Sequence, residues 1–251
     1  MEQINWPTGD ETIQIVAKQT DTVLLSVSRG KDSLAMWLAC KPFFKRIVPV
    51  HMQPLPGLGW CEDYLDYLED KLGAEIIRVL NPNTIHDLND LIYQTPESSA
   101  VVWAHNWPKH YWYQRAQSEL KKQLKLPATA WSGFGIRVED SQLRKFVLRK
   151  WGPISTERHE FKPVWDWKLT RVCQVIRDSG LKLPVDYRLM DRSWEDWDYK
   201  YMRLIEQYFP ADYERIAKFF PLLEADFARH EFAQARREGR SGGPEPPGLS
   251  H

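Results

Sequence analysis

A short stretch of small and polar residues, between an apolar run and a helical pattern, constrains this chain more than any other feature. The apolar run is Thr-Val-Leu-Leu at residues 22–25, and Ser-Val-Ser-Arg-Gly-Lys-Asp-Ser follows at residues 26–33. The apolar run predicts a buried parallel strand, and the residues from Leu34 onwards predict a helix. A strand, a tight loop and a helix N-terminus together form an anion site, because unpaired backbone N–H groups and the positive end of the helix dipole point outward there.

The side chains of this loop favour phosphate as the anion. Ser28 and Ser33 can donate hydroxyl hydrogen bonds, and Lys31 adds a full positive charge. Gly30 is expected where the backbone bends tightly. The commoner phosphate loop requires Gly, four residues and then Gly-Lys-Ser/Thr. That loop is excluded here, because a leucine stands at the first glycine position and an aspartate follows the lysine.

Composition limits the class of protein. The 251 residues suffice for one sizeable α/β domain with an elaborated end. The 34 basic and 34 acidic residues balance, so no overall field draws the chain onto nucleic acid or a membrane. The three cysteines are far apart, which predicts neither a zinc site nor an iron–sulfur cluster and fits a reducing, cytoplasmic location. No apolar run is long enough to cross a bilayer, so no membrane partner is expected.

Strand and helix patterns alternate along the first half of the chain. Strands are predicted at residues 22–25, 46–52, 74–80 and 129–132, with a last edge strand at 161–164, and helices at 11–20, 60–72, 83–93 and 111–124. This order predicts a doubly wound, mainly parallel sheet of about five strands. Pro49 favours either an edge position or an irregularity for its strand, because proline cannot donate to a sheet ladder. Residues 94–109 break the pattern.

The last third of the chain is predicted to be helical. Helices are expected at residues 168–179, 195–208 and 213–237. The domain organisation that follows is an α/β domain over 1–190, a C-terminal helical extension over 191–237 and a disordered tail over 238–251. The tail is rich in Gly, Pro and Ser and cannot bury a core.

A second group of candidate residues follows the fourth predicted strand. Gly133 and Gly135 would let the backbone approach a ligand closely. Arg137 and Arg144 flank a predicted helix start, and residues 140–141 offer its N-cap. Arginine forks suit phosphate or sulfate, although solvated arginines beside a capped helix would give the same pattern.

The strand ends predict where these groups meet. Ligands of parallel sheets bind at the carboxyl ends of the strands. Ser28, Met52 and Gly133 each come just beyond a predicted strand. They are therefore expected to converge on one crevice.

These motifs resemble a known family in sequence. Residues 28–33 resemble the PP-loop of the adenine-nucleotide α-hydrolase superfamily, with Arg29 in place of its first glycine, so residue 29 needs an ordinary backbone conformation. The Gly-x-Arg-x-x-x-Ser-x-x-Arg segment of the phosphoadenosine phosphosulfate (PAPS) reductase family is matched by Gly135, Arg137, Ser141 and Arg144. Residues 162–167 and 180–187 are similar to two further segments of that family, in the same order.

The resemblance implies a Rossmann-like fold that binds ATP or PAPS, with Mg²⁺, and a place in sulfur metabolism. It implies a nucleotide cradle made of Ser26, Ser28, Gly30, Lys31, Asp32 and Ser33, flanked by Gly133 and Gly135, with Met52 against the adenine. Arg29, which replaces the family's first glycine, is expected to bind the nucleotide as an additional cation. Lys31, Arg137 and Arg144 become the candidate catalytic residues, and Asp32 becomes the candidate Mg²⁺ ligand.

The chain departs from the family at the thiol. Reductases of the family use a cysteine near the C-terminus, and this chain has none after Cys173, which is expected to be a buried packing thiol. The family's cluster-binding cysteine pairs are also missing. Cys61 is the remaining candidate for a reactive thiol, but its neighbours Trp60 and Glu62 would not lower its pKa.

Three hypotheses about function follow. The first is an AMP-forming ATP pyrophosphatase that activates an unidentified acceptor by adenylation. The second is a protein that binds PAPS or its unphosphorylated analogue, or reduces it with a thiol from another chain. The third is a non-enzymatic, nucleotide-gated module with a protein or nucleic-acid partner, for which basic residues at 121–125 and 144–150 and aromatic residues at 103–113 are the signal. A homodimer through the C-terminal helices stays open.

Overall fold

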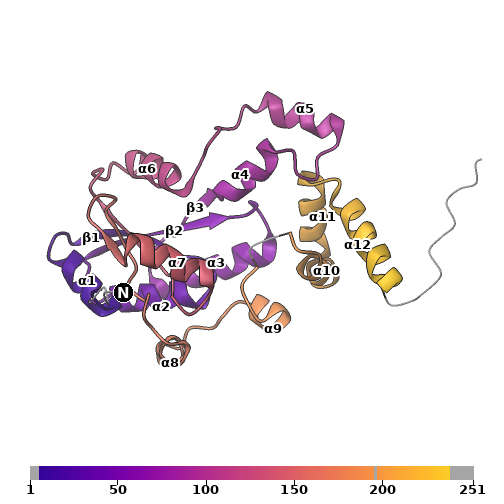
Figure 1. Cartoon of the computed structure of the whole chain (residues 1–251). Coiled ribbons are helices and arrows are strands. Elements are labelled where there is room, and N and C mark those ends of the chain that lie inside the picture. The colour runs from indigo at the N-terminus through magenta and orange to yellow at the C-terminus, as the bar shows by residue number, and fades with distance from the viewer. Residues whose placement is uncertain (1–5, 195–196, 238–251) are drawn as a thin grey trace, which may run out of the picture. The chain divides into compact units, whose positions relative to one another are not determined.

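The computed structural model describes residues 6–194 and 197–237 (Figure 1). The chain divides into two compact units. Unit 1 comprises Met1–Thr84 and His110–Glu195, and unit 2 comprises Ile85–Lys109 and Asp196–His251. Unit 1 is therefore not one continuous stretch, because residues 85–109 belong with the C-terminal helices. The tail expected at residues 238–251 lies outside the described residues.

A mainly parallel sheet forms the centre of unit 1. Within the described residues it has six strands in the order β3-β2-β1-β4-β6-β5, which are Ile77–Leu80, Arg46–Gln53, Thr22–Ser26, Trp131–Phe134, Glu160–Phe161 and Ile154–Ser155. All pairs are parallel except β5 with β6. The predicted α/β class with a Rossmann-like sheet is confirmed. The strand expected at the edge, β6, is covered by β5 instead.

Helices cover both faces of this sheet. The helices of unit 1 are α1 (Gly9–Ala17), α2 (Lys31–Cys40), α3 (Gly59–Leu72), α6 (Tyr113–Gln123), α7 (Gln142–Trp151), α8 (Leu169–Ser179) and α9 (Asp186–Met190). Side chains alternate along β1, since Val23 and Leu25 pack among residues of α1, α2, α3 and α8, whereas Leu24 packs with Leu120 of α6. Figure 1 accordingly shows α2 and α8 on one side of the strands and α6 on the other.

Pro49 does not place β2 at an edge, so that one of the two alternatives is wrong. β2 lies between β1 and β3. Arg46 donates its backbone N–H to Asp21 of the β1 segment, and the carbonyl of Val50 accepts from Val27, so the even-numbered residues of β2 bond toward β1. The nitrogen of Pro49 therefore faces β3, whose pairing begins only at Val50. Proline has no backbone N–H to donate, but β3 does not extend as far as Pro49, so the sheet loses no hydrogen bond there.

Unit 2 is helical. Its elements are α5 (Pro96–Ala104), α10 (Tyr199–Tyr208), α11 (Pro210–Phe219), α12 (Leu223–Arg237) and most of α4 (Pro82–Asn89), which crosses the unit boundary. The single helix expected over residues 213–237 is wrong, because the chain breaks between α11 and α12, where Pro221 cannot continue a helix. Residues 94–109 also contain a helix, which begins in a capping box formed by Thr95 and Ser98.

Two sequence segments form unit 2 through long-range hydrogen bonds. The side-chain amide of Gln94 donates to the carbonyl of Phe219 over 2.7 Å, and the indole N–H of Trp197 donates to Asp87 over 3.0 Å. These bonds explain why residues 85–109 group with the C-terminal helices. Among the described residues, no helix is both long and apolar enough to span a lipid bilayer.

Candidate functional site

The loop that joins β1 to α2 lies at the carboxyl end of β1, as the motif predicts. Ser26 ends β1, and its hydroxyl lies 3.5 Å from the amide nitrogen of Gln117 on α6. The Ser28 hydroxyl accepts the backbone N–H of Gly30 over 3.1 Å. The Ser33 hydroxyl lies 2.6 Å from the carbonyl oxygen of Ser28 and 2.8 Å from that of Gly30. The two serines predicted to donate to phosphate thus bond within the loop and hold it in shape.

The backbone of the loop is unstrained. The backbone bends at Arg29 and Gly30, as expected, but Gly30 has φ −84° and ψ 150°, a conformation that any residue can adopt. A Cβ at this position would lie 3.1 Å from the Ser28 hydroxyl and 3.2 Å from that of Ser193, so Gly30 supplies space. Arg29 does not have a positive φ angle. It therefore has the ordinary backbone conformation that a residue in place of glycine requires.

The N-terminus of α2 has a partner that the sequence did not reveal. Gly30 is the N-cap residue and offers no side-chain cap. The first helical amide, the N–H of Lys31, donates to the hydroxyl of Tyr187 over 2.9 Å. Burial is the main reason that the pKa of this phenol is raised. The only sequence signal for Tyr187 was its place in the 180–187 segment.

The two predicted glycines of β4 and its following segment have different surroundings. A Cβ on Gly135 would lie 2.8 Å from the backbone nitrogen and Cα of Ser33, so this residue lets its segment touch the first turn of α2. A Cβ on Gly133 would lie 2.5 Å from the Leu25 side chain and 3.0 Å from that of Phe161. Gly133 therefore faces the hydrophobic core, while Gly135 meets the loop.

Arg137 connects the Gly135 segment to the loop. Its side chain is almost fully buried, and its Nε donates to Asp32 over 2.6 Å. The same guanidinium donates to Asp140 and, over 3.1 Å, to the carbonyl of Trp167. Glu139 lies 3.4 Å away. Arg137 is thus a clamp in this structure, and its role as a phosphate ligand stays a prediction.

Arg144 completes a chain of alternating charges. It pairs with Asp140 but remains more than one third exposed. Its backbone N–H donates to the hydroxyl of Ser141 over 3.1 Å, which identifies Ser141 as the N-cap of α7. Of the three predicted catalytic cations, Arg144 is the most exposed, so it can turn toward a ligand at the least desolvation cost.

Lys31 and Asp32 are paired with each other. The ammonium of Lys31 lies 3.0 Å from one carboxylate oxygen of Asp32, and Arg137 binds the other oxygen. Both oxygens of the predicted Mg²⁺ ligand are therefore engaged by cations. Within residues 6–194 and 197–237, no group of three or more His, Cys, Asp or Glu side chains is arranged to hold a metal ion.

Arg29 does not project into solvent as an additional cation. It is 2% exposed, and its guanidinium lies 2.6 Å from the carboxylate of Asp186. Asp186 also accepts the indole N–H of Trp60 over 3.1 Å and the backbone N–H of Trp194 over 3.0 Å. The residue that replaces the family's glycine therefore anchors a distant segment beneath the loop.

β2 places one unpredicted histidine beside the loop. Met52 is half-buried inside β2, opposite Val79, because the strand runs one residue further than expected. Its neighbour His51 is buried, with Nδ1 3.0 Å from the carbonyl oxygen of Val27. Burial lowers the pKa of His51 to about 4, so the ring is neutral at pH 7.

The thiols and one basic cluster differ from expectation. Cys173 is exposed on α8, so the predicted buried packing role is wrong. Cys40 and Cys61 are buried, and burial raises the pKa of the Cys40 thiol. Lys121 is 7% exposed and burial lowers its pKa, so the 121–125 cluster is not a fully solvated basic patch.

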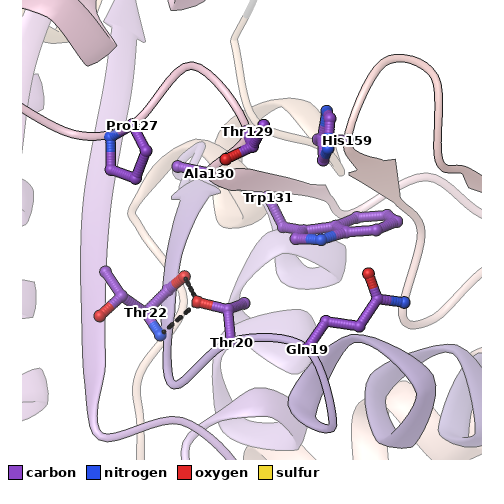
Figure 2. A pocket seen from close by; sticks show the side chains of 8 residues that line it. All are labelled: Gln19, Thr20, Thr22, Pro127, Thr129, Ala130, Trp131 and His159. Carbon is purple, nitrogen blue, oxygen red and sulfur yellow. Dashed lines mark hydrogen bonds between the residues drawn. The ribbon is translucent and has the colours of Figure 1, made fainter.

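A cavity of about 310 Å³ lies at the amino ends of β1 and β4 (Figure 2). Thr22 and Trp131, the first residues of β1 and β4, line it together with Gln19, Thr20, Pro127, Thr129, Ala130 and His159. The loop at residues 26–33 follows the carboxyl end of β1, and the Gly135 segment follows that of β4. The cavity therefore contains none of the predicted site residues.

No protein-family model matches the sequence, and no curated protein matches it. Many solved structures are similar to the chain, among them the following three. An NH3-dependent NAD synthetase from Campylobacter jejuni, in complex with nitrate, has 14% identity and a TM-score of 0.45, with 96% of each chain covered. The U34-tRNA thiolase NcsA from Methanococcus maripaludis, with its [4Fe-4S] cluster, has 14% identity and a TM-score of 0.43, covering 86% of this chain and 80% of that one. A PAPS reductase from Candida auris, in a phosphate complex, has 13% identity and a TM-score of 0.47, covering 76% and 89%.

Proposed function

We propose that unit 1 binds an adenine nucleotide through its phosphate groups at residues 26–33 and cleaves ATP between the α and β phosphates to adenylate an acceptor. The observation that supports this most is the loop itself. It joins a parallel strand to a helix N-terminus without a capping side chain on the N-cap residue. Gly135 brings a second backbone segment to within contact of the same turn. Such a turn supplies amide donors and a positive dipole end for an anion.

The charged residues around the loop have separate roles in this proposal. Lys31 and Arg144 are the cations that can turn to the phosphates, since both keep part of their side chain exposed. Arg137 stays between Asp32 and Asp140 and keeps the Gly135 segment against α2. Catalysis of this kind depends on positioning and on preorganised charge.

The proposed reaction forms one bond to the α-phosphorus and breaks another. A nucleophilic oxygen of the acceptor forms a bond to the α-phosphorus, and the bond from that phosphorus to the bridging oxygen breaks. Pyrophosphate leaves with the bonding electrons, and the acceptor's proton is released to solvent. Negative charge grows on the bridging oxygen, which is where the ammonium of Lys31 would stabilise it.

Mg²⁺ fits the site only with help from the nucleotide. This ion is usually held by one or two carboxylates together with substrate phosphates. Asp32 is the carboxylate of the loop, and Lys31 and Arg137 already bind it. When bound with ATP, the ion would offset phosphate charge, with Asp32 as its protein ligand after Lys31 has turned to the phosphates.

Product analysis tests this proposal directly. The purified chain is incubated with ATP and Mg²⁺, and AMP, pyrophosphate, ADP and phosphate are measured. With water attacking the α-phosphorus in place of the unidentified acceptor, AMP and pyrophosphate in equal amounts are expected from the wild type and from Lys41→Ala, which alters an exposed lysine at the other end of α2. Lys31→Ala should lose this activity. Formation of ADP and phosphate would contradict cleavage between the α and β phosphates.

A further inference from the structure

Residues 184–194, here called the strap, reach the phosphate loop from far along the sequence. Tyr187 of the strap accepts the backbone N–H of Lys31, 156 residues earlier, over 2.9 Å. The Ser193 side chain also bonds to the Tyr187 hydroxyl. This N–H is the first of helix α2, and it is one of the donors that an anion at this turn would use.

The strap is fixed to the loop at a second point. Asp186 is fully buried and forms an ion pair with Arg29, the loop residue next to Gly30. It also accepts hydrogen bonds from Trp60 and from the backbone of Trp194, so both ends of the strap are tied to one carboxylate. The position of Tyr187 over α2 is therefore built into the fold.

Tyr187 itself is less firmly held than Asp186. Its side chain is half-buried, whereas Asp186 has no exposed surface. Rotation of the phenol toward solvent would free the Lys31 amide without breaking the Arg29–Asp186 pair. A phenol oxygen and a phosphate oxygen cannot both accept this one N–H at the same position.

From these contacts we infer that the strap is a built-in competitor for the phosphate site: the Tyr187 hydroxyl stands where a phosphate oxygen would bind, and the nucleotide must displace it. This inference rests on the proposed nucleotide site. Asp186 and Arg29 anchor the strap to the loop, and Tyr187 is the residue of the strap that moves. The strap thereby sets a threshold for nucleotide binding.

Removing the hydroxyl tests the inference. Binding of pyrophosphate and of ATP is measured by calorimetry on the wild type, Tyr187→Phe and Tyr67→Phe. Tyr67 is a matched control, because its hydroxyl accepts the backbone N–H of Lys182 over the same 2.9 Å, away from the loop. Tyr187→Phe should bind both ligands about fivefold more tightly, the worth of one hydrogen bond no longer in competition. Tyr67→Phe should bind them as the wild type does.

Hydrogen exchange gives a readout that needs no ligand. In the free protein, the amide of Lys31 should exchange faster in Tyr187→Phe than in the wild type, and adding ATP to the wild type should speed exchange in the strap. Equal or weaker ligand binding by Tyr187→Phe, with the wild type still binding, would overturn the competitor role and leave the nucleotide site standing. If no variant binds pyrophosphate or ATP, the nucleotide site and the competitor role both fail.

Discussion

Two buried arginines organise the loop from beneath. Arg29 is neutralised by Asp186, and Arg137 is shared among Asp32, Asp140 and a backbone carbonyl. At Arg137 a guanidinium suits this work because its planar fork can serve several acceptors at once. At the scale of single residues, the site therefore consists of clamps that hold the loop and of cations that can move.

Arg137→Ala tests the clamp. The substitution removes the buried cation that Asp32 and Asp140 share and leaves them only the more exposed Lys31 and Arg144, so the free energy of unfolding should fall by about 3 kcal/mol. Arg144→Ala is the control, since this more exposed arginine pairs with the same Asp140 and should cost under about 1 kcal/mol. Urea unfolding of both variants measures the difference. Equal small losses would contradict a structural clamp at Arg137.

His51 should make stability depend on pH. Its pKa is about 4 in the folded protein against 6.5 as the reference value, because burial disfavours the charged ring. The unfolded chain therefore binds a proton that the folded chain does not. The contribution is complete above about pH 6.5 and is lost as the pH falls toward 4, by up to about 3 kcal/mol.

Urea unfolding between pH 4 and pH 7 checks this expectation. His51→Asn should flatten the slope of stability against pH in this window. His105→Asn, which removes an exposed histidine of unit 2, should leave it unchanged. A slope that persists in His51→Asn would show that another group is responsible.

At the scale of elements, the site depends on how closely β4 and its following segment approach β1 and α2. Gly133→Ala would force a methyl group onto the Leu25 and Phe161 side chains, and Gly135→Ala would force one onto the Ser33 backbone. Both substitutions should lower the free energy of unfolding by about 1–3 kcal/mol. Only Gly135→Ala should also weaken ATP binding, because only this residue touches the loop. Calorimetric titration of both variants distinguishes them, and equal effects on binding would contradict the assignment.

Sequence patterns predicted the elements that depend on local signals. The β1–loop–α2 unit was predictable because strand, loop and helix signals lie side by side within residues 22–40. The contact between Lys31 and Tyr187 was not, because it joins residues 156 positions apart and no periodicity specifies it. The same holds for Asp186, whose polar side chain gave no sign that it would be buried against Arg29.

Other errors came from reading one residue without its surroundings. Pro49 suggested an edge strand or an irregularity. Its nitrogen faces β3, but the pairing of β2 with β3 begins only at Val50, after the proline. The helical pattern over residues 213–237 predicts one helix, but Pro221 interrupts it between α11 and α12. Cys173 was expected in the core, yet it lies on the exposed side of α8. The buried side of this helix is formed by Val172 and Ile176.

At the scale of the whole molecule, the candidate site belongs to one unit. The loop, the Gly135 segment and the strap all lie in unit 1, and the C-terminal helices lie in unit 2. Ligand binding stabilises the region that it contacts, by about 2.7 kcal/mol at one hundred times the dissociation constant. A homodimer through the C-terminal helices stays a prediction.

Hydrogen exchange can separate the two units. With ATP at one hundred times its dissociation constant, amides of residues 26–33 and 133–144 should exchange more slowly. Amides of α10, α11 and α12 should be unaffected, because none of the site residues lies there. Protection of these helices equal to that of the loop would contradict a site confined to unit 1.

The measurement that tests the central claim most directly is a calorimetric titration with ATP, ADP and PAPS, with and without Mg²⁺, on the wild type, Lys31→Ala and Lys41→Ala. The account predicts that ATP binds the wild type and Lys41→Ala and that Lys31→Ala abolishes this binding. A preference for PAPS would favour the sulfonucleotide alternative. If none of the three nucleotides binds, or if ATP binding is unchanged in Lys31→Ala, a nucleotide site at this loop is contradicted.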